Sequence, residues 1–282
     1  MSKKIILIAG PTASGKSKLA MELAKKFNGE IINADSMQIF KEFSILSSRP
    51  NLNDTKKIKH HLYGIISVKK YFSVGDWLQE VKKKINFCLK NKKTPIIVGG
   101  TGLYFNTITK GISKIPTIDL KTRNKVRNLY KKVGFKKFYD QLLRIDPKIK
   151  GRILPTDTQR VQRAYEVKLQ TKKSLFDWFA NTKSDFLDYE IKKIFVEIPR
   201  NDLLKKIYKR TDLMFKKNCI NEVKKFNKLK INRTLSANKL IGIQEINNFL
   251  KGSISIEQCK DLINIKTRQY AKRQNTWARG HM

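Results

Sequence analysis

Eight residues near the amino terminus combine glycine, lysine and serine at a spacing that suits phosphate binding: Gly10-Pro11-Thr12-Ala13-Ser14-Gly15-Lys16-Ser17. The two glycines let the backbone turn around a phosphate chain with its amides pointing inward. Lys16 adds a mobile cation, and the hydroxyl of Ser17 can bind Mg2+. The pattern predicts a polyphosphate site, but it specifies neither a nucleotide in general nor ATP in particular.

The flanking residues predict the elements that position this loop. The apolar run 5–9 is typical of a buried strand, and apolar residues at helical spacing follow Ser17. A strand, a glycine loop and a helix in this order are the context that a P-loop requires. The amino terminus of the helix also offers its positive dipole end to an anion. We therefore interpret the motif as a P-loop and not as an ordinary glycine-rich turn.

Two further loops follow predicted strands. Residues 30–34 lead into Asp35-Ser36-Met37-Gln38, and residues 95–98 lead into the glycine loop around Thr101. In an open parallel sheet the carboxyl ends of the strands face the ligand crevice. We therefore expect Asp35 and Thr101 to lie beside the P-loop.

The residues alone leave several roles open for these two side chains. Asp35 suits a general base, a carboxylate associated with magnesium, or a helix N-cap after the strand. Thr101 can offer its hydroxyl to a phosphate or a base, or cap the helix that begins near Leu103. The strand before Thr101 ends in glycines, so the usual Walker B carboxylate is missing there.

The composition is strongly basic. Lysine and arginine outnumber aspartate and glutamate by 61 to 23, for a formal net charge of +38. Such a field attracts polyanions, so nucleic acid and an anionic membrane surface are the candidate partners, with a generically basic surface as the alternative. The sequence has no apolar run of about 18 residues and no signal-like apolar region, so we expect a cytoplasmic protein.

The cysteines are isolated from one another in the chain: Cys88, Cys219 and Cys259. Two histidines are adjacent, His60 and His61, and the third lies near the end. The spacing predicts reduced cysteines in the core, with no disulfide framework and no metal cluster.

Between about 119 and 193 the pattern changes to helices, and the first of them carries Arg123. A later helix begins at Asp157, and at 100° per residue one face of it gathers polar side chains: Gln159, Gln162, Arg163 and Glu166. Val161 takes the opposite face and Arg160 the flank. A face of this kind suits phosphate and base-edge contacts, although a solvated helix face is the alternative.

We predict an α/β fold with a P-loop NTPase-like parallel sheet core and an inserted all-helical domain. The core comprises residues 1–118 plus 194–282, and the insertion comprises 119–193. A long helix after Asn201 carries Lys206 and Arg210 four residues apart. This pair can clamp a diphosphate across the crevice, or it can simply be solvated.

Six motifs in chain order resemble one family. They are residues 10–17, Asp-Ser-Met-Gln at 35–38, His-His-Leu at 60–62, Val-Gly-Gly-Thr-Gly-Leu-Tyr at 98–104, Asp-Thr-Gln-Arg-Val-Gln-Arg-Ala at 157–164, and Thr-Arg-Gln-Tyr-Ala-Lys-Arg-Gln-Asn-Thr-Trp at 267–277. The chain resembles the bacterial tRNA dimethylallyltransferases, or isopentenyl-tRNA transferases, over essentially its whole length.

The resemblance implies a reaction. A dimethylallyl group passes from dimethylallyl diphosphate, with Mg2+, to N6 of the adenosine immediately 3′ of the anticodon in tRNA. The inserted helical domain is expected to grip the anticodon stem-loop, and the enzyme to act as a monomer without a membrane partner.

The resemblance also implies site residues by matching position. Asp35 becomes the base, residues 12–17 hold the diphosphate, and Arg210 assists Lys16 in stabilising the leaving group. The implied tRNA contacts are Asp35, Ser36, Met37, Gln38, Thr101, Arg123, Gln159, Arg160, Val161, Gln162 and Arg163. Ile243-Gln244 replaces the Tyr-Lys or Tyr-Arg pair common in the family, so we expect that tRNA contact to differ.

Two rival functions are weaker. A P-loop kinase for a small metabolite requires a Walker B aspartate on the third strand, which is absent. The positive charge of this chain also far exceeds what a small substrate needs. A non-catalytic RNA-binding module accounts for the charge but for neither the P-loop nor Asp35.

Overall fold

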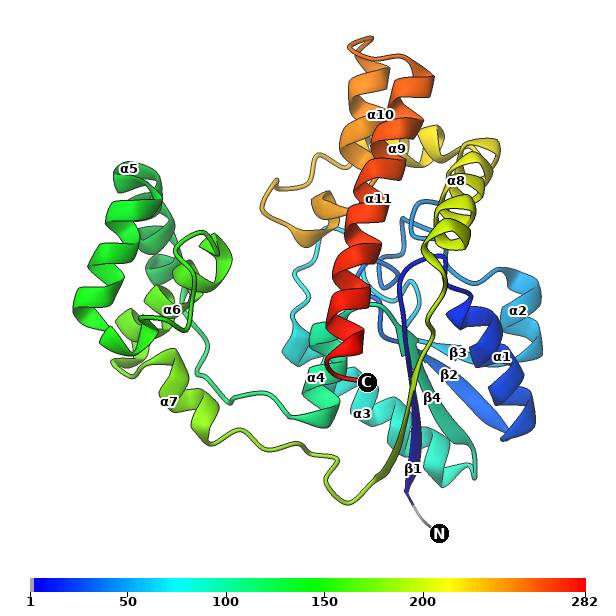
Figure 1. Ribbon diagram of the computed structural model, residues 1–282, viewed down its shortest axis with the longest axis horizontal. Coiled ribbons are helices and arrows are strands. Elements are labelled where there is room, and N and C mark those ends of the chain that lie inside the picture. The colour runs from blue at the N-terminus through cyan, green and yellow to red at the C-terminus, as the bar shows by residue number, and fades with distance from the viewer. Residues whose placement is uncertain (1–2) are drawn as a thin grey trace. The chain divides into compact units, whose positions relative to one another are not determined.

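A parallel sheet of five strands lies at the centre of the computed structural model, which describes residues 3–282. The strands are β1 (Lys4–Ala9), β2 (Gly29–Asn33), β3 (His60–His61), β4 (Thr94–Gly99) and β5 (Glu190–Phe195). Their order is β3-β2-β4-β1-β5, and every neighbouring pair is parallel (Figure 1). The carboxyl ends of β1, β2 and β4 therefore meet at one edge, as predicted.

The central strands are apolar because both of their faces are covered. On one face, Ile6 and Ile8 pack with Ala20 and Ala24 of α1 (Lys16–Lys26). Successive side chains alternate, so the other face meets α3 (Val74–Lys90), whose Trp77 donates from Nε1 to the carbonyl of Asn33 at 2.9 Å.

The two edge strands are less regular than the central ones. β5 carries exposed lysines, which are typical of a sheet edge. β3 is only two residues long, and beyond it Ile66 makes an isolated bridge with Phe40.

Six further helices belong mainly to the first unit. They are α2 (Leu52–Lys57), α4 (Gly102–Thr109), α8 (Arg200–Lys216), α9 (Cys219–Lys228), α10 (Ile243–Leu250) and α11 (Ile256–Arg279), with a 3-10 turn at Ser236–Lys239. Capping boxes begin two of the long helices: Ser73 with Asp76 begins α3, and Ser255 with Gln258 begins α11. Helices α8 and α11 pack together, and a separate apolar core lies under α9 and α10.

The second unit, Thr107–Asp185, is helical. It contains α5 (Leu120–Ile145), a 3-10 turn (Pro147–Ile149), α6 (Thr158–Thr171) and α7 (Leu175–Ala180). Gly134, at φ 73°, breaks α5 into two helices. The core of this unit is built around Phe138, which is fully buried beside Tyr165.

The fold class is confirmed: an α/β core of the P-loop type carries an inserted helical unit. The insertion bounds of 119–193 stay a prediction, while the contacts of the structure divide the chain after Asn106 and after Asp185. Residues 107–118 belong with the helices because Ile118 is buried in their core, and residues 186–193 belong with the sheet because they lead into β5. Within residues 3–282, we find no helix with the length and apolar character needed to cross a membrane.

Candidate active site

The P-loop connects β1 to α1 in a geometry that two glycines permit. Gly15 lies at φ 95°, which strains any residue with a Cβ, and it begins α1. A Cβ at Gly10 would lie 2.9 Å from the carbonyl oxygen of Val196, so the loop packs tightly against the end of β5. The first amides of α1 have no partner within the helix, as an anion site requires. Within the loop, the amides of Thr12 and Ser14 donate to Gln274 Oε1 and to the carbonyl of Pro11.

Lys16 folds back over this loop and donates from Nζ to the carbonyl of Pro11 at 2.9 Å. Burial lowers the pKa of Lys16 to about 8, an effect opposed by the nearby carboxylate of Asp35 and reinforced by Arg210. The three charged side chains therefore act on one another within a single crevice.

Asp35 follows β2 in a turn that is fixed by the buried side chain of Asn33. The amide of Asp35 donates to Asn33 Oδ1 at 2.9 Å, and Asn33 Nδ2 donates to the carbonyls of Asp35 and Leu62. Oδ1 of Asp35 accepts from the amide of Met37 at 2.9 Å, and no helix begins here. The helix N-cap interpretation of Asp35 is therefore replaced by a turn cap that uses one carboxylate oxygen.

The negative charge of Asp35 reaches three tyrosines: Tyr63, Tyr104 and Tyr270. Burial, and then this charge, raises the pKa of each well above its ordinary value, so all three are neutral at physiological pH.

Thr101 joins the glycine loop after β4 to the turn after β2. Its Oγ1 accepts from the amide of Ser36 at 2.9 Å, and its own amide donates to the carbonyl of Ala34 at 3.1 Å. A hydrogen bond with Thr101 also acts on the hydroxyl of Tyr270. The hydroxyl of Thr101 is thus directed toward Ser36 in the turn after β2 and not toward the start of α4.

The two basic residues of α8 separate. Arg210 reaches into the crevice, where Nη1 donates to Thr12 Oγ1 and Nη2 makes a long contact of 3.5 Å with the carbonyl of Leu46. Lys206 is exposed. The proposed clamp therefore retains Arg210, while Lys206 fits the solvated alternative.

Two cavities meet at these side chains. A polar pocket of about 170 Å³ is lined by Lys16, Ser17 and other P-loop residues. A second pocket of about 260 Å³ has apolar walls that include Met214, Leu240 and Ile263. Both pockets are lined by Thr12, Asp35, Ser47 and Arg210. The carboxylate of Asp35 thus lies where a phosphate-binding space joins an apolar one.

The chain matches a known family along most of its length. The family model described as "IPP transferase" matches residues 38–281. This chain belongs to the IPP transferase family.

Members of this family align with nearly all of the chain, in sequence and in structure. A protein of Pelagibacter ubique named "tRNA dimethylallyltransferase" is 54% identical over 279 residues, which are 99% of this chain and 89% of that protein. A tRNA isopentenylpyrophosphate transferase of Bacillus halodurans has a similar crystal structure, with a TM-score of 0.69 and 31% identity over 98% of this chain and 87% of that one. A eukaryotic dimethylallyltransferase described as acting on tRNA aligns with a TM-score of 0.84 and 29% identity, covering 98% of this chain and 70% of that one.

In this member of the family, Gln274 of α11 joins two of the loops. Its Oε1 accepts from the amide of Thr12 at 2.8 Å, and its Nε2 donates to the carbonyl of Gly100 at 3.0 Å. The side chain is only 6% exposed. Sequence reasoning missed this role, although Gln274 lies inside the motif at 267–277 that carried the resemblance.

Glu222 of α9 fixes the loop that forms another wall. Its carboxylate accepts from the amides of Ser44 at 2.7 Å, Ile45 at 2.9 Å and Leu46 at 2.8 Å. This loop presents the carbonyl of Leu46 to Arg210, and its next carbonyls accept from Gln38 Nε2. No local pattern in the sequence indicated the contact.

The other predicted residues lie on helices of the second unit. Gln159 and Arg160 are exposed at the start of α6, and Gln162, Arg163 and, on α5, Arg123 are partly buried. Val161 is 1% exposed and packs in the core. The predicted tRNA contact of Val161 therefore requires a correction, because its side chain belongs to the helical core and cannot reach a ligand.

Proposed function

We propose that the protein transfers a dimethylallyl group from dimethylallyl diphosphate to N6 of the adenosine immediately 3′ of the anticodon in tRNA. Family membership and the named relatives support the tRNA dimethylallyltransferase activity itself. The observation that carries the finer assignment is the position of Asp35, on the wall shared by the polar and the apolar pocket.

The polar pocket suits the diphosphate of the donor. P-loop amides, Lys16 and Arg210 supply donors and positive charge where charge builds up on the leaving diphosphate. Preorganised donors of this kind stabilise a transition state more than the ground state because the charge they face grows during the reaction.

The same pocket fits a magnesium ion. The hydroxyl of Ser17 and the carboxylate of Asp35 both line it, and oxygen ligands beside a diphosphate are what Mg2+ prefers. When bound, the ion would supply further positive charge to the diphosphate.

The apolar pocket suits the carbon skeleton of the donor and the incoming base. A target base in a stacked loop must leave its stack to react, at a cost of about a few kcal/mol. Met214, Leu240 and Ile263 offer the apolar surface that compensates for this.

Adenine N6 is a weak nucleophile because its lone pair is delocalised into the ring, and Asp35 assists it by accepting its proton. N6 attacks C1 of the dimethylallyl group, the bond from C1 to the diphosphate oxygen breaks, and the diphosphate leaves with that electron pair. The N6 proton passes to the carboxylate of Asp35. Oδ1 already accepts from Met37, so Oδ2 is the atom assigned to the proton.

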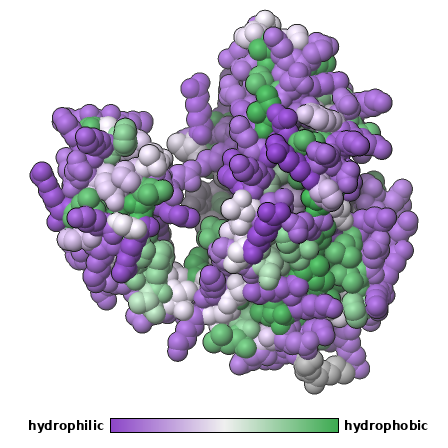
Figure 2. All heavy atoms as spheres, viewed as in Figure 1, coloured by the Kyte–Doolittle hydropathy of each residue, from purple (hydrophilic) through white to green (hydrophobic). Residues whose placement is uncertain are grey.

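The tRNA itself is held by charge. A net charge of +38 is more than a small substrate needs, and hydrophilic side chains cover much of the visible surface (Figure 2). We assign contacts with the anticodon stem-loop to three arginines of the second unit, Arg123, Arg160 and Arg163. We also propose that the protein acts as a monomer.

A direct assay tests the proposal. The protein is incubated with labelled dimethylallyl diphosphate, Mg2+ and bulk tRNA, and the tRNA nucleosides are then analysed by mass. We expect N6-(dimethylallyl)adenosine and one diphosphate per transfer. With ATP in place of the donor, formation of ADP in proportion to a phosphorylated acceptor would support the kinase alternative instead.

A further inference from the structure

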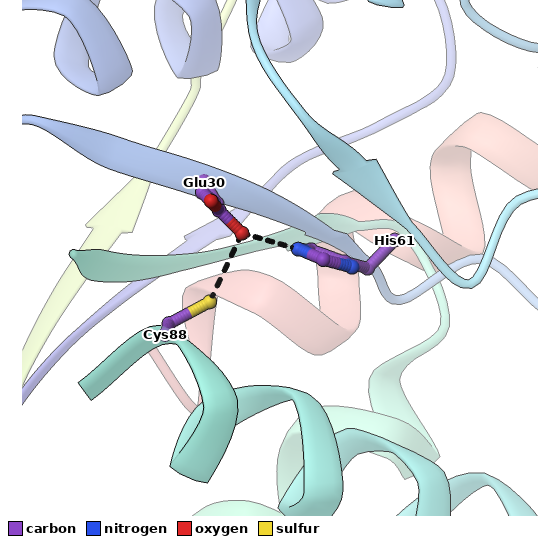
Figure 3. A group of neighbouring side chains, drawn as sticks. All are labelled: Glu30, His61 and Cys88. Atoms are coloured by element: carbon purple, nitrogen blue, oxygen red, sulfur yellow. Dashed lines mark hydrogen bonds and ion pairs between the residues drawn. The ribbon is translucent and has the colours of Figure 1, made fainter. Parts of the chain in front are cut away.

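Three side chains with metal-binding atoms meet in the core of the first unit, each from a different element. Glu30 comes from β2, His61 from β3 and Cys88 from α3 (Figure 3). His61 Nε2 lies 2.5 Å from Glu30 Oε2, and Cys88 Sγ lies 3.7 Å from the same oxygen. All three residues are buried, and their ligand atoms lie within 4.8 Å of one another.

This cluster is separate from the candidate active site. Glu30 lies near the amino end of β2, whereas Asp35 follows its carboxyl end. Five residues of extended chain span roughly 16 Å, so the two carboxylates serve different regions of the sheet. None of the three side chains has a part in the proposed transfer.

Oε2 of Glu30 is the atom that the other two side chains share, since His61 Nε2 and Cys88 Sγ both contact it. A buried polar group is costly unless it has a partner, and a cation at this point would be a partner for all three ligand atoms. Lys59 and Lys84 are the cations whose charge reaches the cluster, so an added ion must overcome their repulsion.

We propose that Glu30, His61 and Cys88 bind a divalent ion of the zinc class. One sulfur, one nitrogen and one oxygen are a donor set that zinc accepts, whereas Mg2+ and Ca2+ prefer oxygen alone. A thiolate and a carboxylate together neutralise the two charges of the ion, which offsets the repulsion from the two lysines.

The geometry needs only a small adjustment. Zinc bonds of about 2.0–2.3 Å place tetrahedral ligands roughly 3.3–3.8 Å apart. The distance between His61 Nε2 and Glu30 Oε2 must therefore lengthen by about 1 Å. The thiol of Cys88 releases one proton to solvent, and the proton of His61 moves to Nδ1. A surface pocket of about 330 Å³ is lined by Glu30 and Lys59. Water from solvent would supply the fourth ligand.

A bound ion would tie β2, β3 and α3 together at the edge of the sheet. Its effect is therefore on stability, and it can be measured without any assay of activity. Anything that binds the folded state alone raises the melting temperature.

Cobalt titration of the full-length, chelator-treated protein gives a specific readout. Co2+ bound to a thiolate shows charge-transfer absorption in the near ultraviolet, which ions bound through oxygen at the P-loop do not show. We expect this band to saturate at one ion per chain, Zn2+ to displace it, and Zn2+ to raise the melting temperature.

Two cysteine variants identify the thiolate that gives the absorption band. Cys88→Ala should abolish it and weaken zinc binding by more than the roughly 10–100-fold typical of losing an outer-shell partner. Cys259→Ala removes a thiol that is equally buried in the other core of this unit, and it should leave the band intact. If Cys88→Ala does not fold, the absorption bands of the wild-type protein and of Cys259→Ala still test the proposal. No band in the wild-type protein, or loss of the band in Cys259→Ala, would overturn the proposal.

Discussion

Gln274 Oε1 accepts a hydrogen bond from the amide of Thr12 at 2.8 Å, although 262 positions separate the two residues in the chain. The same side chain donates to the carbonyl of Gly100. The last helix of the protein therefore sets the distance between the P-loop and the glycine loop, and with it the position of the Thr12 hydroxyl that Arg210 contacts.

Gln274→Met keeps the volume of this side chain and removes both hydrogen bonds. At about 1 kcal/mol each, we expect the KM for dimethylallyl diphosphate to rise by roughly tenfold or more, with the KM for tRNA little changed. Steady-state kinetics with each substrate varied in turn measure the effect. Gln269→Met changes an exposed residue of the same helix and serves as the control. An equal rise in both KM values would show a general disturbance of the fold.

Asp35→Asn keeps the shape of the side chain and its turn but removes a good proton acceptor. We expect the chemical step to slow by roughly 10²–10⁴-fold, the usual contribution of a general base, with smaller changes in substrate binding. Single-turnover rates at saturating substrates measure this step.

Two other roles of Asp35 give different results. A magnesium-ligand role predicts weaker donor binding and activity partly restored by high Mg2+. A purely structural role predicts a lower melting temperature with nearly normal turnover. Near-normal single-turnover chemistry in Asp35→Asn would eliminate the general base.

The pKa of Lys16, lowered to about 8 in the free protein, predicts an alkaline limit. The side chain loses its positive charge as pH rises through this value, so kcat/KM for the donor, which reports the free enzyme, should fall above about pH 8. Lys16→Ala should nearly abolish turnover because the leaving diphosphate loses a cation. Unchanged turnover at saturating donor would contradict this role.

The effect of Lys16 on stability has the opposite sign. Because folding lowers its pKa from 10.5, the unfolded chain binds more protons at this side chain between about pH 8 and 10.5. This residue alone therefore makes the free energy of unfolding rise with pH in that window. Chemical denaturation of Lys16→Ala and of the wild-type protein at about pH 7.5 and about pH 10 isolates the contribution. The free energy of unfolding of the wild-type protein minus that of the variant should be larger at about pH 10 than at about pH 7.5.

Replacing Arg160 and Arg163 together by Gln should weaken tRNA binding and flatten its salt dependence. Removing one arginine from a tRNA phosphate reduces the slope of log K against log salt by about 0.7–0.9. Donor affinity should stay the same. Changing Lys131 and Lys132 to Gln removes equal charge from exposed positions of α5 and is the matched control. Equal salt slopes in the wild-type protein and both double variants would leave the α6 face as solvated surface.

Local signals predicted much of the fold. The P-loop and the apolar strands are encoded within a few neighbouring residues, and the structure confirms them. The capping boxes at Ser73 and Ser255 are local in the same sense. The crevice formed by Asp35 and Thr101 also followed from the sequence, because parallel strands end at a common edge.

Contacts between distant segments were not predictable in this way. Glu222 reaches a loop some 176 residues earlier, and Gln274 reaches the P-loop, without any periodic pattern that marks their partners. The cluster of Glu30, His61 and Cys88 depends on the order of the strands and on the helix face that α3 presents, so spacing alone indicated no metal site. Val161 was misjudged because position in a motif does not distinguish a buried side chain from an exposed one.

The wall shared by the polar and the apolar pocket has a kinetic consequence for the end of the reaction. On the proposed function, inorganic diphosphate would occupy the polar pocket and leave the neighbouring apolar space empty. It would then compete with the donor while a base can still enter. Released diphosphate should therefore inhibit competitively against dimethylallyl diphosphate and noncompetitively against tRNA. In a cell, removal of diphosphate by hydrolysis would then speed turnover by freeing the P-loop as well as by drawing the equilibrium forward.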